Sequence, residues 1–291
     1  MNVFSAVGAV MLAFAPIVSA GAQGQQNIDE LLARVGQRVS EFYNRAKSVI
    51  CVETSTVQPI DASYSTHGFT RTVESELRIE IDGGQGTGEA AVVRKVRKVN
   101  GRAPREQDAQ KRDGCTDPTP LSSEPLAFLL TPQRFDYQFK VAGTTKERDR
   151  NAVMIDFSSA NRRSNPVLIE DPAGHENCFD WSGHIASRGR IWVDAETHDV
   201  LRLERGLLGP VSVKVPALIQ RRYHIDNWVV IVREDVTIRY NTIAFSDPDE
   251  VLLLPSSIDT LSLVRGGLQS TRRTQRYSEY RRFVTEGKVL H

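Results

Sequence analysis

The chain has 291 residues, and its 40% hydrophobic and 25% charged residues are ordinary for a globular protein. Its 37 Lys and Arg residues balance 36 Asp and Glu residues, which gives a formal net charge of +1. Nucleic-acid binders usually carry a clear basic excess, so this balance argues against a nucleic-acid partner.

The N-terminus has the pattern of an export signal. Residues 6–20, AVGAVMLAFAPIVSA, are apolar and uncharged, and they are too few to span a membrane comfortably. The stretch ends in small residues, and Val18-Ser19-Ala20 and Ala20-Gly21-Ala22 both resemble the A-x-A pattern of a signal-peptide cleavage site. The segment before them lacks Lys and Arg, so a retained membrane anchor is the alternative. We predict that residues 1–22 are a signal peptide and that residues 23–291 form one β-rich domain, periplasmic or secreted.

An amphipathic helix is predicted next, over residues 27–50. Asn27 is a good N-cap, and Glu30 completes a capping-box-like pair. Apolar residues recur at three- and four-residue spacing, which is one face of a helix: Ile28, Leu31, Leu32, Val35, Val39, Phe42, Tyr43 and Ala46.

From about residue 49 the apolar period changes to two, which indicates strands with one buried face. Residues 72–82 alternate most clearly, and GGQGTG (83–88) is a predicted hairpin loop. Further strands are predicted at 89–101, 135–143, 152–159, 189–194, 200–205, 217–226, 228–244, 257–265 and 270–283, with a short helix at 121–132 and an irregular segment at 160–187.

These elements predict a mostly β (α+β) fold. About eleven antiparallel strands would form a curled sheet or half-barrel, because such a sheet must hide its apolar face. The N-terminal helix and the short helical insert would cover the concave face.

This organisation resembles the periplasmic lipoprotein-carrier superfamily, the half-barrel of the outer-membrane lipoprotein-localisation proteins and related envelope-stress regulators. The resembling stretches are the leader, FYNRAKSVI, FDYQFKVAG, LLLPSSIDTLSL and GRIWVDAETHDVLRLE, over roughly residues 28–283. The end QRYSEYRRF also resembles a group of exported proteins from soil bacteria. Long polar insertions at 101–120 and 160–187 depart from the carrier pattern.

The resemblance implies an apolar cavity that holds acyl chains. We therefore predict a non-catalytic binding protein that holds a lipid or docks an envelope partner. The alternative is that the same residues fill a closed core. The candidate cavity residues are the inward-facing ones: Leu77, Ile79, Tyr137, Phe139, Ile155, Phe157, Val230 and Val232.

Few residue patterns in the sequence support a catalytic function. HENCFDWSGH (175–184) offers His175, Cys178, Asp180 and His184, whose side chains suit zinc, but their spacing matches no known zinc pattern. A metal-dependent hydrolase that uses this loop is the alternative function, and a structural or signalling envelope component is another. No cofactor, catalytic residue or metal site is predicted.

The three cysteines predict one disulfide and one free thiol in an oxidising compartment. Counting the turns of an up-and-down meander places the connections at 101–133 and 160–188 at one end of the sheet, opposite the start of the first strand. We therefore predict a Cys115–Cys178 disulfide and a buried Cys51.

Two stretches have a structural and a functional interpretation. The basic strands 94–105 and 272–282 are expected to form a solvated face, with contact to anionic lipid headgroups as the alternative. In GRIWVDAETHDVLRLE (189–204), Asp194 and Thr197 are expected to cap a turn between two strands. Glu196, His198 and Asp199 would then face solvent.

Overall fold

The structure is a computed structural model. It describes residues 20–45, 49–81, 90–105, 125–161, 165–170 and 179–282, without the side chains of 20–26, 79–81 and 90–93. No helix in these ranges is long and apolar enough to cross a membrane.

Helix α1 spans Ala20–Arg45. It begins before Asn27, so the predicted N-cap is wrong, and it ends at Arg45 because the two-residue period of the first strand starts at Val49. The predicted apolar stripe is confirmed: the buried residues of the helix are Ile28, Leu32, Val35 and Val39.

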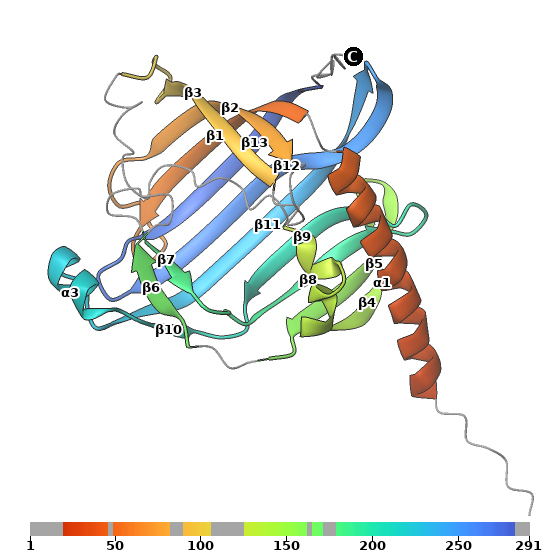
Figure 1. The fold of residues 1–291 in the computed structure, drawn as a ribbon, viewed down its shortest axis with the longest axis horizontal. Coiled ribbons are helices and arrows are strands. Elements are labelled where there is room, and N and C mark those ends of the chain that lie inside the picture. The colour runs from red at the N-terminus through yellow and green to blue at the C-terminus, as the bar shows by residue number, and fades with distance from the viewer. Residues whose placement is uncertain are drawn as a thin grey trace, which may run out of the picture.

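Thirteen strands form one large, open and curled sheet (Figure 1). Their bounds are β1 Val49–Ile60, β2 Arg71–Ile81, β3 Ala90–Val99, β4 Tyr137–Glu147, β5 Arg150–Ser159, β6 Val167–Glu170, β7 Phe179–Ser182, β8 Ser187–Asp194, β9 Val200–Leu207, β10 Val211–Lys214, β11 Trp228–Ser246, β12 Asp249–Arg265 and β13 Ser270–Arg282. All pairings are antiparallel except that between β10 and β6. The mostly β fold and the curled antiparallel sheet are confirmed.

The strand order is β3-β2-β1-β13-β12-β11-β9-β8-β5-β4, with β10, β6 and β7 attached to β11. The first strand therefore pairs with the last, and β3 and β4 lie at opposite edges of the sheet. A simple meander is thus wrong, because the chain crosses from one edge to the other between β3 and β4.

Three local predictions were also wrong. Residues 217–226 are not a strand: helix α3, Ala217–Tyr223, follows β10 and ends at His224, which has a left-handed backbone. The segment 160–187 holds the short strands β6 and β7. The described part of the insert forms two 3₁₀ turns, η1 Ala127–Leu129 and η2 Gln133–Asp136, instead of an α-helix.

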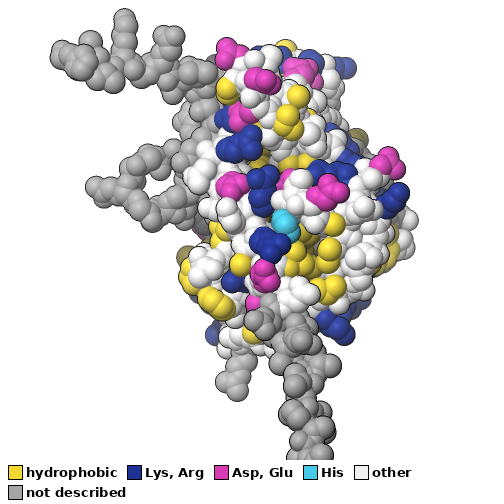
Figure 2. Space-filling model, turned by 90° about the vertical axis from the view of Figure 1, so that its right-hand side faces the viewer, with side chains coloured by type: hydrophobic (Ala, Val, Ile, Leu, Met, Phe, Trp, Pro, Cys, Tyr) yellow, Lys and Arg dark blue, Asp and Glu magenta, His cyan; other side chains and the backbone are white. Residues whose placement is uncertain are grey.

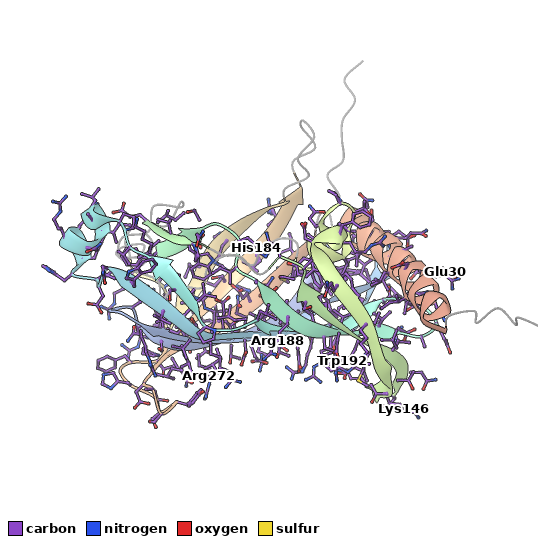
Figure 3. The ribbon with its side chains drawn as sticks, turned by 90° about the horizontal axis from the view of Figure 1, so that it is seen from below. Glu30, Lys146, His184, Arg188, Trp192 and Arg272 are labelled. Carbon is purple, nitrogen blue, oxygen red and sulfur yellow. The ribbon has the colours of Figure 1, made fainter. Side chains whose placement is uncertain are left out.

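Two units cover the concave face. Helix α1 and the insert pack on the larger apolar cluster, which includes Val35, Leu129 and Ile191. The second unit, formed by β6, β7, β10 and α3, packs on a separate cluster around Ile231 (Figure 1). The opposite face of the sheet is largely polar, and Figure 3 labels Arg188 and Trp192 on that side.

Candidate functional site

Five of the eight predicted cavity residues gather in the cluster under α1. Leu77, Ile155 and Phe157 are buried there, and Tyr137 and Phe139 are half-buried against it. Phe128 of the insert occupies the space between the aromatic rings, with ring centroids 4.6 Å from Phe157 and 5.3 Å from Tyr137. These side chains therefore pack against one another beneath the insert.

The other three predicted residues are placed differently. Ile79 lies outside the described side chains. Val230 and Val232 are half-buried, whereas Val229 and Ile231 are the buried residues of this strand segment. The face assignment was wrong because a bulge between Ile231 and Arg233 shifts the register. The inward-facing residues of β11 are therefore odd-numbered before the bulge and even-numbered after it.

A pocket of about 290 Å³ opens between α1 and the rim of the sheet. Eight of its lining residues are apolar or aromatic: Val39 and Phe42 of α1, Leu126 of the insert, and Val200, Tyr240, Val251, Leu252 and Leu253 of the sheet. None of the eight predicted residues lines it. The helix stripe had marked Val39 and Phe42 as inward-facing, but only the docking of α1 creates the pocket.

Tyr240 contributes an unusual polar atom to this region. The residue is only 3% exposed, and its hydroxyl has no hydrogen-bond partner among the residues that the structure describes. Its ring meets that of Phe42 edge-on at 6.5 Å. Burial raises the pKa of Tyr240 well above its ordinary value, so the hydroxyl stays protonated and uncharged.

Paired charges form the rim of the pocket. Arg38 of α1 lies 3.0 Å from a carboxylate oxygen of Asp199, and Arg45 lies 3.3 Å from Glu250 and donates to the carbonyl of Val251 at 2.9 Å. In Figure 2, side chains of both charge signs lie close together on this side, with apolar side chains between them. A ligand that enters here meets no excess of either charge.

The 189–204 hairpin supplies part of this rim. Asp194 accepts hydrogen bonds from the backbone N–H groups of Glu196 at 2.9 Å and Thr197 at 2.7 Å, as turn chemistry requires. Burial alone would raise the pKa of Asp194, but these two bonds and Arg150, at 2.8 Å, lower it. Asp199 is not solvent-facing as predicted, because it is half-buried and paired with Arg38.

A second polar feature is buried in the β1 region of the sheet. Glu53 is 0% exposed and accepts hydrogen bonds from Gln275 at 2.8 Å, Tyr277 at 3.2 Å and Arg94 at 2.8 Å. Glu53 was not predicted to be buried, although it lies in phase with the buried Cys51 and Val57 on one face of β1.

A broad groove of about 1040 Å³ lies on the face away from α1, over β4, β5, β8, β9 and β11. Two of its carboxylates are paired: Arg190 donates to both oxygens of Asp156, at 2.6 and 3.1 Å, and Glu204 pairs with Arg202 beside the groove. Arg202 also lies over the ring of Trp192, 4.5 Å from its centroid. This face therefore carries ion pairs that are partly exposed to solvent.

The basic strands follow the same pattern. Lys98 pairs with Glu74 at 3.1 Å, and Arg281 pairs with Glu76 at 3.2 Å. Arg276 shares Asp259 with a second arginine, at 3.0 Å. These three basic side chains therefore have neighbouring carboxylates, as the solvated-face interpretation expects.

The proposed zinc loop is only partly covered by the structure. His175 and Cys178 lie outside the described residues, and Asp180 and His184 are exposed. Across the described ranges, no group of three or more His, Cys, Asp or Glu side chains could hold a metal ion. The hydrolase alternative stays a prediction.

The cysteine prediction is met at Cys51, which is free and 2% exposed. Burial, and secondarily Glu53, raises its pKa to about 12. Cys115 and Cys178 lie outside the described residues, so their pairing stays a prediction. The antiparallel pairings make β1, β3 and β5 run in the same direction, so β3 and β5 end at the same end of the sheet.

Comparisons with known proteins give only distant structural matches. No protein-family model and no curated protein matches the sequence. A LolA superfamily protein from Nitrosomonas europaea is 10% identical, over 89% of this chain and 97% of its own, with a TM-score of 0.35.

Two further solved structures match at similar levels. A putative outer membrane lipoprotein-sorting protein domain from Vibrio parahaemolyticus is 11% identical, over 88% of this chain and 94% of its own, with a TM-score of 0.31. A DUF1329 family protein from Desulfovibrio piger is 11% identical, over 90% and 92%, with a TM-score of 0.34.

Proposed function

We propose that this chain is an exported, non-catalytic binding protein that holds one small apolar ligand, such as a single acyl chain, between α1 and the sheet. The pocket beneath α1 is the observation on which the proposal depends. Its walls are apolar, while the charges of its rim are paired with one another.

The size of the pocket limits the ligand. Its 290 Å³ lies at the lower end of the range of small-molecule sites, about 300–1,000 Å³, so several acyl chains would not fit without movement of α1. Burial of apolar surface would drive binding, at about 25 cal/mol per Å². An ionised group inside would lose its hydration without gaining a partner, so the proposal favours an uncharged ligand.

An uncharged fluorescent probe, N-phenyl-1-naphthylamine, tests the proposal. We expect saturable binding to one site, with blue-shifted emission. Thr242 is exposed at the mouth of the pocket, so Thr242→Trp should obstruct entry without disturbing the core, and binding should weaken at least tenfold. Thr66→Trp, in the exposed β1–β2 loop, is the matched control and should bind like the wild type. Absence of saturable binding would refute the proposal.

Export is tested separately. Expression of the full chain in a bacterium with a periplasm, followed by N-terminal sequencing, should give a mature chain that starts after Ala20 or Ala22. Recovery of the protein with its leader intact in the membrane fraction would favour the anchor alternative.

A further inference from the structure

The hydroxyl of Tyr240 is an exception among the tyrosines of the apolar cluster under α1. Three others have hydrogen-bond partners: Tyr43 accepts from the N–H of Leu126 at 3.1 Å, Tyr277 donates to Glu53 at 3.2 Å, and Tyr280 donates to the carbonyl of Pro255. Tyr240 is 3% exposed and has no partner among the described residues. Burying a hydroxyl without a hydrogen bond is costly, so a bound molecule that supplied an acceptor here would remove that cost.

Strand β11 places Tyr240 inside the entrance of the pocket under α1. Tyr240 and Thr242 both line the pocket and are two residues apart on the strand, so their side chains point to the same face. Thr242 is exposed at the mouth, whereas Tyr240, Val39 and Leu252 are each 3% exposed. Tyr240 therefore belongs to the inner wall, about 7 Å along the strand from the mouth.

Neighbouring residues locate the hydroxyl itself. The ring of Phe42, another lining residue, meets the ring of Tyr240 edge-on at 6.5 Å. Burial is the main cause of the raised pKa of Tyr240, and the nearby Tyr43 hydroxyl adds to it. Since Tyr43 is bonded to Leu126, which also lines the pocket, the Tyr240 hydroxyl lies on the side of the pocket where Leu126 forms the wall.

The charged residues that line the pocket already have partners. Their ion pairs are Arg38 with Asp199 and Glu41, Arg45 with Glu250, and Arg150 with Asp194. A ligand that bonded to one of these groups would compete with an existing ion pair. Among the described lining residues, Tyr240 is thus the buried polar side chain that is left for a ligand.

We propose that the ligand of this pocket carries an uncharged carbonyl group, as in an ester, amide or ketone, and that the Tyr240 hydroxyl donates a hydrogen bond to it. This inference rests on the proposed binding function and specifies the ligand chemistry of the same site. A carbonyl oxygen only accepts, so one donor satisfies it, whereas an alcohol also brings a proton that needs an acceptor. A carboxylate would be buried without a free cation, and a pure hydrocarbon would leave Tyr240 unpaired.

Two probes of nearly equal shape, butyrophenone and butylbenzene, test the preference for a carbonyl. Each is measured by its displacement of N-phenyl-1-naphthylamine from the wild type and from Tyr240→Phe. The substitution removes the hydroxyl and keeps the ring, so the affinity for butyrophenone should fall about fivefold or more. The affinity for butylbenzene should change less than about twofold, because this probe offers no acceptor for a hydrogen bond. Comparison of each probe with itself cancels the different hydration of the two probes.

Tyr277→Phe is the matched control, because its hydroxyl is bonded to Glu53 and the residue is not among those that line the pocket. It should leave the affinity for both probes unchanged but lower the melting temperature, since Glu53 loses a buried donor. Tyr240→Phe should instead melt at or above the wild-type temperature, because it removes an unpaired polar atom from the interior.

Three results would overturn this inference. Equal weakening of both probes by Tyr240→Phe would mean that the hydroxyl does not select the carbonyl, and an unchanged affinity for butyrophenone would exclude the hydrogen bond. A marked loss of stability in Tyr240→Phe would show that the hydroxyl has a partner in the unliganded protein. Saturable binding of N-phenyl-1-naphthylamine, which has no carbonyl, would leave the proposed function intact in all three cases. Its absence from the wild type would refute the proposed function and this inference together.

Discussion

Replacement of Asp194 by alanine should destabilise the protein through the turn of the β8–β9 hairpin. The side chain is 6% exposed and accepts two backbone N–H groups. A hydrogen bond to a charged group contributes about 1.5–3 kcal/mol, but the exposed residues Glu196 and Thr197 let water replace part of the loss. The partner Arg150 is 34% exposed, so that ion pair adds no more than about 1 kcal/mol.

Because water can replace much of what the two hydrogen bonds and the ion pair contribute, we expect a net loss of about 2 kcal/mol for Asp194→Ala, below the sum of their separate contributions. Chains of this size lose about 2–4 °C in melting temperature per kcal/mol, so we expect a decrease of about 4–8 °C. Asp194→Asn keeps an oxygen that can accept both N–H groups but loses the charge, and should cost about half as much. Denaturant unfolding followed by circular dichroism measures the free energy of unfolding of both variants.

The pH dependence gives a second check on the same residue. The pKa of Asp194 is lowered in the folded state, so its contribution is complete above the unfolded pKa of about 3.9 and disappears as the pH falls through the folded pKa. The difference between wild type and Asp194→Ala should therefore shrink at pH 3 relative to pH 7.

Glu196→Ala is the matched control, because this carboxylate belongs to the same turn and is exposed. It should leave stability within about 0.5 kcal/mol of the wild type. The reasoning fails if Asp194→Ala is as stable as this control, or if the alanine and asparagine variants are equally destabilised.

Three other predictions concern the interior. Glu53→Ala leaves Arg94 without its buried carboxylate and should cost about 3–5 kcal/mol in denaturant unfolding; a neutral result would mean that Arg94 reaches solvent. Phe157→Ala should cost about 3–5 kcal/mol, whereas Phe135→Ala, at a ring that is 71% exposed, should cost less than about 0.5 kcal/mol, and similar losses would contradict the packing. The Cys51 thiol, with a pKa of about 12, should not react with Ellman's reagent at about pH 8 until the protein is unfolded.

The two-residue period predicted most long strands correctly because each strand buries one face, and the residues themselves carry that requirement. The same holds for α1, whose apolar stripe places Val35 and Val39 against the sheet. Turn chemistry is equally local, so Asp194 was recognised as a capping residue before its hydrogen bonds were known.

Face assignments failed where the period was interrupted. A bulge adds one residue and inverts the inward set, so Val230 and Val232 exchanged places with Val229 and Ile231. No residue in β11 announces the bulge, because it depends on how β11 pairs with β12. The buried position of Glu53 was missed for a related reason, since its partners come from strands far along the chain.

The sequence by itself determined most of the long elements, the curled antiparallel sheet and the helix that covers it, because periodicity and turn residues act over a few positions. Only the tertiary structure decided that β1 pairs with β13 and that β3 and β4 become the two edges. Strand order depends on the free energy of long-range pairing, which no local pattern encodes. The pocket under α1 follows from that order and from the docking of the helix, and so does the site proposed for a ligand.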